Sequence, residues 1–402
     1  MPISGKIAEM MERSSWIRRM FEEGARLKAQ VGEENVFDFT LGNPVGEPPE
    51  EVAQELARLA SERGKGAHRY MPNAGLPEAR AKIAGYLKAA TGLPFGIGNV
   101  IMTVGAGGAL NVIIKALCAP GDEMVILAPY FAEYNFYADN HNVSIKVART
   151  TPDFQIDAGE IEKAITPRTR VVLLNSPNNP TGAIYPADAL AAVSRLLAER
   201  TAEYGRKIYL VMDEPYRKLT YDNVTAPNVF LAGNNVIVAT SHSKDLNLPG
   251  ERIGYIAIHP EVEHAGRIFD AMTLAIRILG FVNAPALFQR LVAGMQDVAP
   301  DMSVYAENRR ILLDGLAAAG YGITPPMGGF YIFAKSPVPD DVEFVNILKS
   351  MNTLVVPGSG FGAPGYFRIA FCCAPETCRG ALPAFAEAIR QAREGSAPDG
   401  KE

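Results

Sequence analysis

Residues with reactive, charged or conformationally special side chains follow four short apolar runs in the middle of the chain. The runs are 100–104, 171–174, 208–212 and 236–240. If they are parallel β-strands, their carboxyl ends meet at one edge of a sheet, where α/β domains bind ligands. One anionic, aromatic ligand would account for the residues that these ends supply together. The set comprises Gly105, Ala106, Gly107, Gly108, Asn179, Asp213, Tyr216, Ser241, Ser243, Lys244 and Arg252.

The turn over residues 105–108, Gly-Ala-Gly-Gly, precedes a helical segment. Free backbone N–H groups at the start of a helix, together with the positive end of the helix dipole, bind anions. The turn is not a dinucleotide-binding GxGxxG motif, because Leu110 occupies the position of the last glycine, and it has no P-loop lysine. From this turn alone, an anion site and an ordinary tight strand-to-helix connection both remain open.

The segment 241–254, SHSKDLNLPGERIG, is more specific. Two hydroxyls, a lysine and an arginine at this spacing could bind a phosphate and present an amine beside it. A solvated surface lysine is the competing interpretation of Lys244, but it fits poorly at the end of a buried strand. His242, between the two serines, is assigned no role.

This segment resembles the lysine signature of the class I and II aminotransferases, which belong to fold type I of the pyridoxal-phosphate enzymes. The resemblance covers nearly the whole chain, because further motifs occur in the family's order. They are HRYMPNAGLPEAR (68–80), NNPTG (178–182), DEPY (213–216), PGSGFG (357–362) and FRIAF (367–371). The resemblance implies an enzyme that moves an amino group between an L-amino acid and a 2-oxo acid with pyridoxal 5'-phosphate.

The resemblance also implies roles for single residues. Lys244 would hold the cofactor as a Schiff base and then move the α-proton of the substrate. Asp213 would keep the pyridine nitrogen protonated, while Tyr216 and Asn179 would hydrogen-bond the 3-oxygen of the ring. Structural roles remain open for these three, since Asp213 could cap a helix, Tyr216 could be core and Asn179 lies in a turn-rich stretch.

The phosphate would be held by Arg252, whose planar fork donates parallel hydrogen bonds. The resemblance adds Ser241, Ser243 and the backbone N–H groups of Ala106 and Gly107 to this site. Tyr130 matches the aromatic residue that stacks on the cofactor ring. Tyr70 resembles the tyrosine that reaches the phosphate of the neighbouring subunit, which implies a homodimer with active sites at the subunit interface.

The substrate α-carboxylate would be bound by Arg368, assisted by the backbone of Gly42 and the side chain of Asn179. Arg277 lies near the position from which some aspartate aminotransferases supply an arginine to the partner's active site. An exposed structural arginine is the alternative there. Some family members have a histidine three residues after the stacking aromatic; Glu133 stands there, which leaves the partner of Asp213 open.

The same scaffold supports other reactions, so a C–S β-lyase and an aromatic aminotransferase remain alternatives. A regulatory protein is a further class, but such relatives usually carry an added DNA-binding domain, and no basic helix-turn-helix precedes the core.

Strand-length apolar runs alternate with helical segments through the middle of the chain, which predicts a large, doubly wound, mostly parallel α/β domain. The runs are 100–104, 124–127, 171–174, 208–212, 236–240 and 255–258, and the clearest helical segments are 107–118 and 187–204. A long helical segment (285–319), short strands (330–333 and 367–371) and a closing helix (380–394) predict a smaller α+β domain.

We expect three regions. Residues 1–48 form an N-terminal amphipathic helix and arm that pack with the small domain, residues 49–289 the large cofactor-binding domain, and residues 290–402 the small domain. A length of 402 residues agrees with two domains.

The composition, with 48% apolar and 21% charged residues, is typical of a soluble globular protein. The net charge of −5 disfavours nucleic-acid and anionic-membrane partners. Four cysteines without CxxC spacing predict no disulfide framework, and five histidines without metal-site spacing predict no metal. With no signal peptide or bilayer-length apolar run evident, a cytoplasmic protein is expected.

Overall fold

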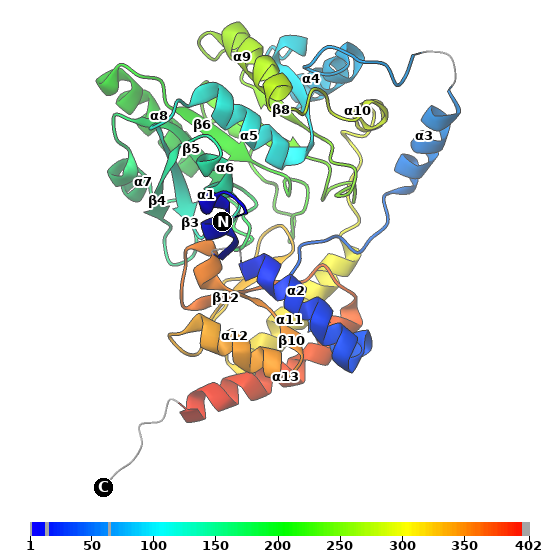
Figure 1. Cartoon of the computed structure of the whole chain (residues 1–402), viewed down its shortest axis with the longest axis vertical. Helices are drawn as coiled ribbons and strands as arrows, with labels where there is room; N and C mark the ends of the chain where they lie inside the picture. The colour runs from blue at the N-terminus through cyan, green and yellow to red at the C-terminus, as the bar shows by residue number, and fades with distance from the viewer. Residues whose placement is uncertain (1, 13–15, 63–65, 396–402) are drawn as a thin grey trace.

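The computed structural model describes residues 2–12, 16–62 and 66–395. Two parts are evident, a large one built around a seven-stranded sheet and a smaller one beneath it in the view of Figure 1. Within the described ranges, no helix combines the length and the apolar character that crossing a bilayer requires.

The large sheet has the strand order β2-β8-β7-β6-β5-β3-β4. Its strands are β2 (Val100–Thr103), β3 (Glu123–Ala128), β4 (Ser144–Arg149), β5 (Thr169–Asn175), β6 (Tyr209–Asp213), β7 (Val236–Ser241) and β8 (Gly254–Ile258). The five strands from β7 to β4 pair in parallel, whereas β8 is antiparallel to both β7 and β2. The sequence pattern groups the apolar run 255–258, which forms β8, with the parallel strands. It runs the other way because residues 242–253 return directly from β7 without a crossover helix.

Both faces of this sheet are covered. Successive side chains of a strand point to opposite faces, so on β3 Met124 and Ile126 belong to one apolar cluster, and Val125 and Leu127 to the other. The first cluster packs under α5 (Gly105–Leu117), α6 (Tyr134–Asp139) and α9 (Ala265–Ile278). The second packs under α3 (Glu50–Ser61), α4 (Pro77–Thr91), α7 (Ala158–Ala164), α8 (Ala187–Tyr204) and α10 (Ala286–Ala293). The expected doubly wound, mostly parallel architecture is confirmed.

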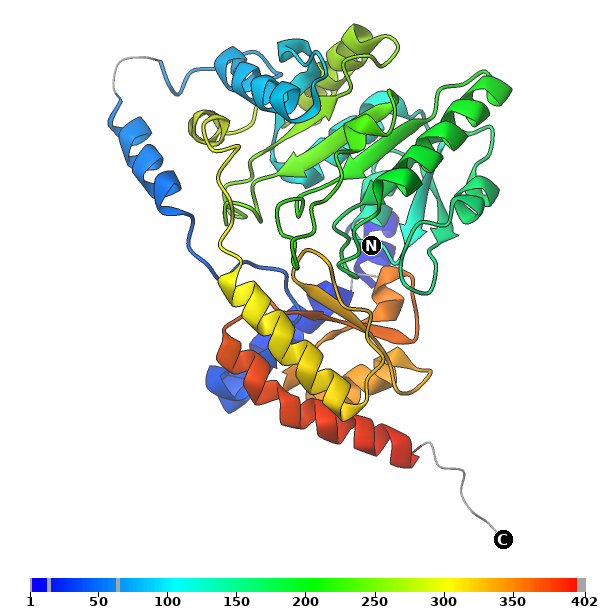
Figure 2. The same cartoon turned by 180° about the vertical axis from the view of Figure 1, so that it is seen from behind.

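The small part contains the antiparallel sheet β11-β12-β9 and the parallel pair β1–β10. The strands are β1 (Phe37–Asp38), β9 (Tyr331–Lys335), β10 (Thr353–Leu354), β11 (Val356–Pro357) and β12 (Tyr366–Ala370). Its helices are α2 (Trp16–Val31), α11 (Ser303–Ala319), α12 (Asp341–Ser350) and α13 (Pro375–Gly395). Figure 2 shows α11 (yellow) and α13 (red) packed side by side in this part.

Two helical segments differ from the expectation. Residues 285–319 form two helices, α10 and α11, because Gly294 and Pro300 interrupt the segment between them. The N-terminal segment also forms two helices, α1 (Gly5–Glu12) and α2, and residues 13–15 between them lie outside the described ranges.

The two helices of the N-terminal segment contact different parts of the molecule. Glu23 of α2 pairs with Lys349 of the small part at 2.6 Å, whereas Lys6 of α1 pairs with Asp139 of the large part at 2.7 Å. Residue 289 lies inside α10, which packs against α3 and α4 of the large part. We therefore propose a first boundary near residue 48 and a second within residues 294–302, after α10, rather than at residue 289.

Candidate active site

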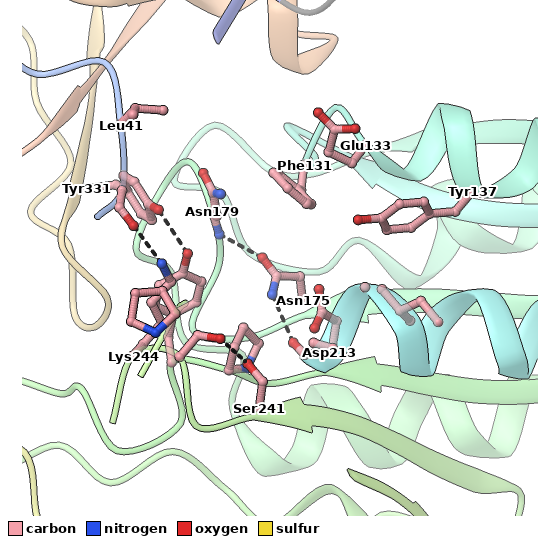
Figure 3. Close-up of a pocket in the computed structure, with 18 of the residues that line it drawn as sticks. Leu41, Phe131, Glu133, Tyr137, Asn175, Asn179, Asp213, Ser241, Lys244 and Tyr331 are labelled. Carbon is pink, nitrogen blue, oxygen red and sulfur yellow. Dashed lines mark hydrogen bonds between the residues drawn. The ribbon is translucent and has the colours of Figure 1, made fainter. Parts of the chain in front are cut away.

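A cavity of about 340 Å³ lies at the carboxyl ends of β5, β6 and β7, where the small part meets the large sheet. This is the edge at which α/β sheets bind ligands. Figure 3 shows side chains from both parts converging on it. The lining residues are Leu41, Gly42, Ala106, Gly107, Leu110, Phe131, Glu133, Tyr137, Asn175, Asn179, Asp213, Pro215, Tyr216, Ser241, Ser243, Lys244, Pro249, Arg252, Tyr331 and Arg368.

Most residues singled out from the sequence line this one cavity. They are Gly42, Ala106, Gly107, Asn179, Asp213, Tyr216, Ser241, Ser243, Lys244, Arg252 and Arg368. Tyr130, Tyr70 and Arg277 are not among its lining residues.

Lys244 follows β7 and directs its amine towards the small part. The Nζ atom donates a hydrogen bond to the carbonyl oxygen of Gly42 at 2.6 Å. Burial, more than the nearby cations Arg252 and Arg368, lowers the pKa of Lys244 to about 8. An amine with this pKa is partly neutral near neutral pH and can act as a nucleophile or a base.

Asp213 ends β6 and is buried, with 5% of its surface exposed. The hydroxyl of Tyr134 donates to Oδ2 at 2.6 Å, and the buried Oδ1 has no hydrogen-bond partner. Burial raises the pKa of Asp213 to about 7, against the opposing effect of Tyr134. An unpartnered buried carboxylate oxygen is costly, so this atom is suited to a positively charged or N–H-bearing ligand group.

Backbone and side-chain donors gather at the start of α5. Gly105 has φ +72°, and a Cβ there would lie 2.9 Å from the Nη2 atom of Arg252, so only glycine lets the guanidinium approach so closely. Ala106 and Gly107 stand in the first turn of α5, whose N–H groups have no partner within the helix. The hydroxyls of Ser241 and Ser243 lie 3.2 Å apart. These donors can hold a phosphate group.

Arg368 of β12 is almost fully buried, with 1% of its surface exposed. Its Nη1 donates to Asn179 Oδ1 at 3.1 Å and its Nη2 to the Thr40 carbonyl, while Nε has no partner. The guanidinium lies over the rings of Tyr331 and Phe361, at 4.7 and 4.9 Å. Among the described residues, no carboxylate pairs with it. A buried arginine without a counter-ion is suited to a carboxylate ligand.

Aromatic and amide side chains complete the wall. The hydroxyls of Tyr216 and Tyr331 lie 2.8 Å apart. Asn175 donates to the Asp213 carbonyl at 2.8 Å and accepts from the Asn179 backbone N–H at 2.7 Å, as Figure 3 shows. Asn175 and Tyr331 were not singled out from the sequence, because an asparagine at a strand end and a tyrosine in an apolar strand carry no distinctive motif.

Of the two adjacent aromatic residues Tyr130 and Phe131, Phe131 lines the cavity. The ring of Tyr130 lies against Gly362, where a Cβ would come within 2.5 Å of it. We therefore propose that Phe131, rather than Tyr130, takes the position of the stacking aromatic residue. Counting from Phe131, the third residue is Tyr134, the partner of Asp213, and not Glu133. Figure 3 shows Phe131, Glu133 and Tyr137 on one side of the cavity.

Tyr70 and Arg277 lie outside the cavity of their own chain. Tyr70 is 93% exposed, and Arg277 is exposed in the last turn of α9. Either side chain can serve an active site only if that site belongs to another copy of the chain.

The sequence model of the class I and II aminotransferases matches residues 34–385. The chain belongs to this family. It is 33% identical over 360 residues to the aspartate/prephenate aminotransferase of Thermus thermophilus, covering 88% of this chain and 91% of that enzyme. It is 29% identical over 372 residues to the aspartate aminotransferase of Thermotoga maritima, covering 91% and 95% of the two chains.

Solved structures agree with this assignment. An aminotransferase from Eubacterium rectale superposes with a TM-score of 0.93 and 36% identity, covering 97% of this chain and 99% of that one. Aspartate aminotransferase from Thermus thermophilus with maleate superposes with a TM-score of 0.85 and 28% identity, covering 96% and 99%. The predicted fold type I architecture and aminotransferase activity are confirmed. The protein is thus an enzyme of a family that uses pyridoxal phosphate and acts on amino acids and 2-oxo acids.

Replacing Asp213 with asparagine is expected to stabilise the cofactor-free chain at alkaline pH. The pKa of Asp213 rises from an ordinary value of 3.8 to about 7 on folding. The folded chain therefore loses stability as pH rises from 3.8 to about 7, and this loss is complete above that range. Because asparagine does not ionise, the free energy of unfolding should exceed that of the wild type by about 2–4 kcal/mol at pH 8.

Urea unfolding of both cofactor-free proteins at several pH values measures this difference. It should shrink as pH falls towards 4. A difference that stays constant between pH 5 and pH 8 would show that the carboxylate of Asp213 is not raised in pKa.

Proposed function

We propose that this aminotransferase carries pyridoxal 5'-phosphate on Lys244 and exchanges amino groups between an L-amino acid and a 2-oxo acid in the cavity of Figure 3. One observation carries the proposal. Lys244, Arg252 and Asp213, whose Oδ1 has no hydrogen-bond partner, line a single cavity. A planar aldehyde with a ring nitrogen and a phosphate presents matching groups to all three.

The chain's own residues fit that cofactor. Asp213 would accept a hydrogen bond from the ring nitrogen through Oδ1, while Asn179 and Tyr216 would face the 3-oxygen. Phe131, in place of Tyr130, would contact the ring face. Arg252 would hold the phosphate with Ser241, Ser243, Ala106 and Gly107. When bound, pyridoxal phosphate supplies an electron sink that stabilises negative charge at the substrate α-carbon.

The remaining residues position the substrate and move its proton. Arg368 would bind the α-carboxylate with its free Nε and its Nη groups, beside the amide of Asn179. Gly42 lies at this end of the cavity, since its carbonyl accepts from Lys244. With the carboxylate held there, the amine of Lys244 would take a proton from the α-carbon and return it.

A half-reaction screen tests this function. The protein is loaded with pyridoxal phosphate and mixed with single amino acids, and the absorbance band of the lysine-linked cofactor is followed. A transaminase should lose this band and recover it when a 2-oxo acid is added. Release of pyruvate and ammonia from cystathionine without any 2-oxo acid would instead indicate a C–S lyase, and no cofactor band at all would refute the proposal.

For the substrate, we propose a dicarboxylic amino acid, aspartate or glutamate. Several relatives are named aspartate aminotransferases, including those of Thermotoga maritima and Pyrococcus horikoshii. In this chain the proposed reader of the side-chain carboxylate is Arg277, supplied by the partner subunit. Its exposure on α9 leaves it available to another copy.

Replacing Arg277 with leucine is expected to raise the KM for aspartate by roughly 10- to 100-fold, because a charge-assisted hydrogen bond contributes about 1.5–3 kcal/mol. The KM for phenylalanine should change little. Steady-state kinetics with both donors measures the difference. Arg267→Leu, also exposed on α9, is the matched control. Equal changes for aspartate and phenylalanine would assign Arg277 a structural role.

We also propose a homodimer whose active sites lie at the subunit interface. Leu274, Ile278 and Val282, which are near Arg277 in the chain, have exposed apolar side chains, and Tyr70 is 93% exposed. Exposed apolar groups of this size mark interaction surfaces. A twofold-symmetric interface would cover them and bring Tyr70 to the phosphate site of the partner subunit.

A further inference from the structure

A second buried cluster of charged side chains lies behind the loop that carries Lys244, and the proposed reaction does not use it. Ser243 and Lys244 line the active-site cavity, whereas His242 and Asp245 line a separate polar cavity. Ser241 borders both cavities. The side chains of this short segment thus divide between two chambers.

Four residues, which we name the anchor network, meet in the second chamber: Lys218, His242, Asp245 and Gln296. His242 Nδ1 lies 3.2 Å from Asp245 Oδ2, and Lys218 Nζ lies 3.4 Å from the same oxygen. Lys218 also donates to the carbonyls of Gln296 and Val298, at 2.6 and 3.0 Å. Lys218 and His242 thus both meet the carboxylate of Asp245 at Oδ2, while its buried Oδ1 has no hydrogen-bond partner.

The amide of Gln296 determines which nitrogen of His242 carries the proton. Gln296 Nε2 donates to the Val292 carbonyl at 2.7 Å and lies 3.2 Å from His242 Nε2. An amide nitrogen can only donate, so His242 Nε2 accepts and Nδ1–H donates to Asp245. In this arrangement the imidazole bridges the amide and the carboxylate. Although burial raises the pKa of Asp245, His242 and Lys218 together bring it below its usual range, so the carboxylate is ionised.

The network ties the lysine loop to distant segments. Residues 242–253 contain no helix or strand. The N–H of His242 donates to the Ile253 carbonyl at 3.1 Å, and its own carbonyl accepts from Leu248 at 3.2 Å. Lys218 lies after β6 and Gln296 after α10, so their side chains hold the loop from two directions.

A stabilising role alone does not explain such a cluster. Buried ion pairs contribute little net stability, because desolvation offsets their attraction, and apolar residues of similar volume often serve as well. What the network does provide is a fixed orientation for His242 and Asp245, which flank Lys244 closely in the chain.

We propose that His242 and Asp245 are positioning residues, which hold the loop so that the amine of Lys244 points at the carbonyl carbon of the cofactor. This inference rests on the proposed function. It predicts that the network supports covalent attachment to Lys244 more than it supports the contacts to the ring and the phosphate.

Two cofactor forms separate these contributions. Pyridoxal phosphate has an aldehyde that can bond to Lys244, whereas pyridoxamine phosphate has the same ring and phosphate but cannot form that bond. The dissociation constants of both are measured by absorbance and fluorescence titration of the full-length cofactor-free chain. The variants are His242→Phe and Asp245→Asn. Ser194→Ala is the control, because Ser194 is buried and hydrogen-bonded to Asn235, outside both chambers.

In both variants the affinity for pyridoxal phosphate should fall roughly tenfold or more, since a small misplacement of a reacting group has effects of this size. The affinity for pyridoxamine phosphate should change less than about threefold, because this form has no group that bonds to Lys244 and misplacement of the amine does not affect it. Ser194→Ala should leave the ratio of the two affinities unchanged. His242→Asn, whose amide can still donate to Asp245, should restore part of the ratio lost in His242→Phe, and it provides a second measurement if Asp245→Asn does not fold.

Equal losses for both cofactor forms, or no loss for either, would overturn the positioning role. A wild-type chain that does not prefer pyridoxal phosphate over pyridoxamine phosphate would instead contradict the attachment to Lys244 and hence the proposed function.

Discussion

Replacing Lys244 with alanine is expected to abolish turnover and the absorbance band of the lysine-linked cofactor. Lys244 lines the proposed active-site cavity, and burial keeps part of its amine neutral by lowering its pKa to about 8. No other lysine lines the cavity within the described part of the chain. The rate should fall by about 10⁴-fold or more, at the upper end of the contribution of a general base.

Lys244→Arg tests whether a positive charge at position 244 is sufficient for turnover. Arginine keeps the positive charge but remains protonated, so it can neither bond to the cofactor nor accept the α-proton. Both variants should therefore be equally inactive, and added small amines should restore part of the turnover only in Lys244→Ala, where space is available. Normal turnover in Lys244→Ala, measured with the best amino donor, would contradict the central role of this residue.

Replacing Asp213 with asparagine is expected to lower kcat/KM by about 10²–10⁴-fold. Removing one partner of a buried charge pair typically costs about 3–5 kcal/mol, and 1.4 kcal/mol corresponds to a factor of ten. Asparagine can accept the hydrogen bond of Tyr134, but it cannot hold a proton on the ring nitrogen. Single-turnover kinetics at saturating cofactor separates this effect from weaker cofactor binding.

Tyr134→Phe is the matched control, because it removes only the 2.6 Å hydrogen bond to Asp213. Its effect should be smaller, about 10- to 100-fold, as expected for one hydrogen bond to a charged group. An Asp213→Asn enzyme within about threefold of the wild type would be incompatible with the loss expected for a buried charge pair. The same substitution should stabilise the cofactor-free chain. The carboxylate of Asp213 therefore lowers the stability of the folded chain but is needed for activity.

Several strands of the large sheet could be predicted from the local pattern of apolar residues in the sequence. The runs 124–127, 171–174 and 236–240 were predicted as strands because strands buried on both faces need unbroken apolar sequence. The strand β4 was missed for the same reason, since it lies at the sheet edge and most of its side chains are at least partly exposed. The reversed direction of β8 was also missed, because apolar content does not depend on strand direction.

Within the site, the sequence by itself determined which chemical groups stand at the strand ends: the amine of Lys244, the carboxylate of Asp213 and the guanidinium of Arg252. Those groups belong to motifs that are contiguous in the chain. Only the tertiary structure decided which side chains from distant segments of the chain meet in the site. It brings Tyr331 from the small part to the wall of the same cavity, beside Arg368, for which the family resemblance implied a place there, and it leaves the Nε of Arg368 without a partner.

The tertiary structure also decided which of two neighbouring aromatic residues lines the cavity. Tyr130 and Phe131 are adjacent aromatic residues, and only the packing of Tyr130 against Gly362 assigns Phe131 to the cavity. The tyrosine that hydrogen-bonds Asp213 follows from the same placement. Residue type and spacing along one segment are properties of the sequence, whereas burial, partner choice and the resulting pKa depend on segments that approach each other only after folding.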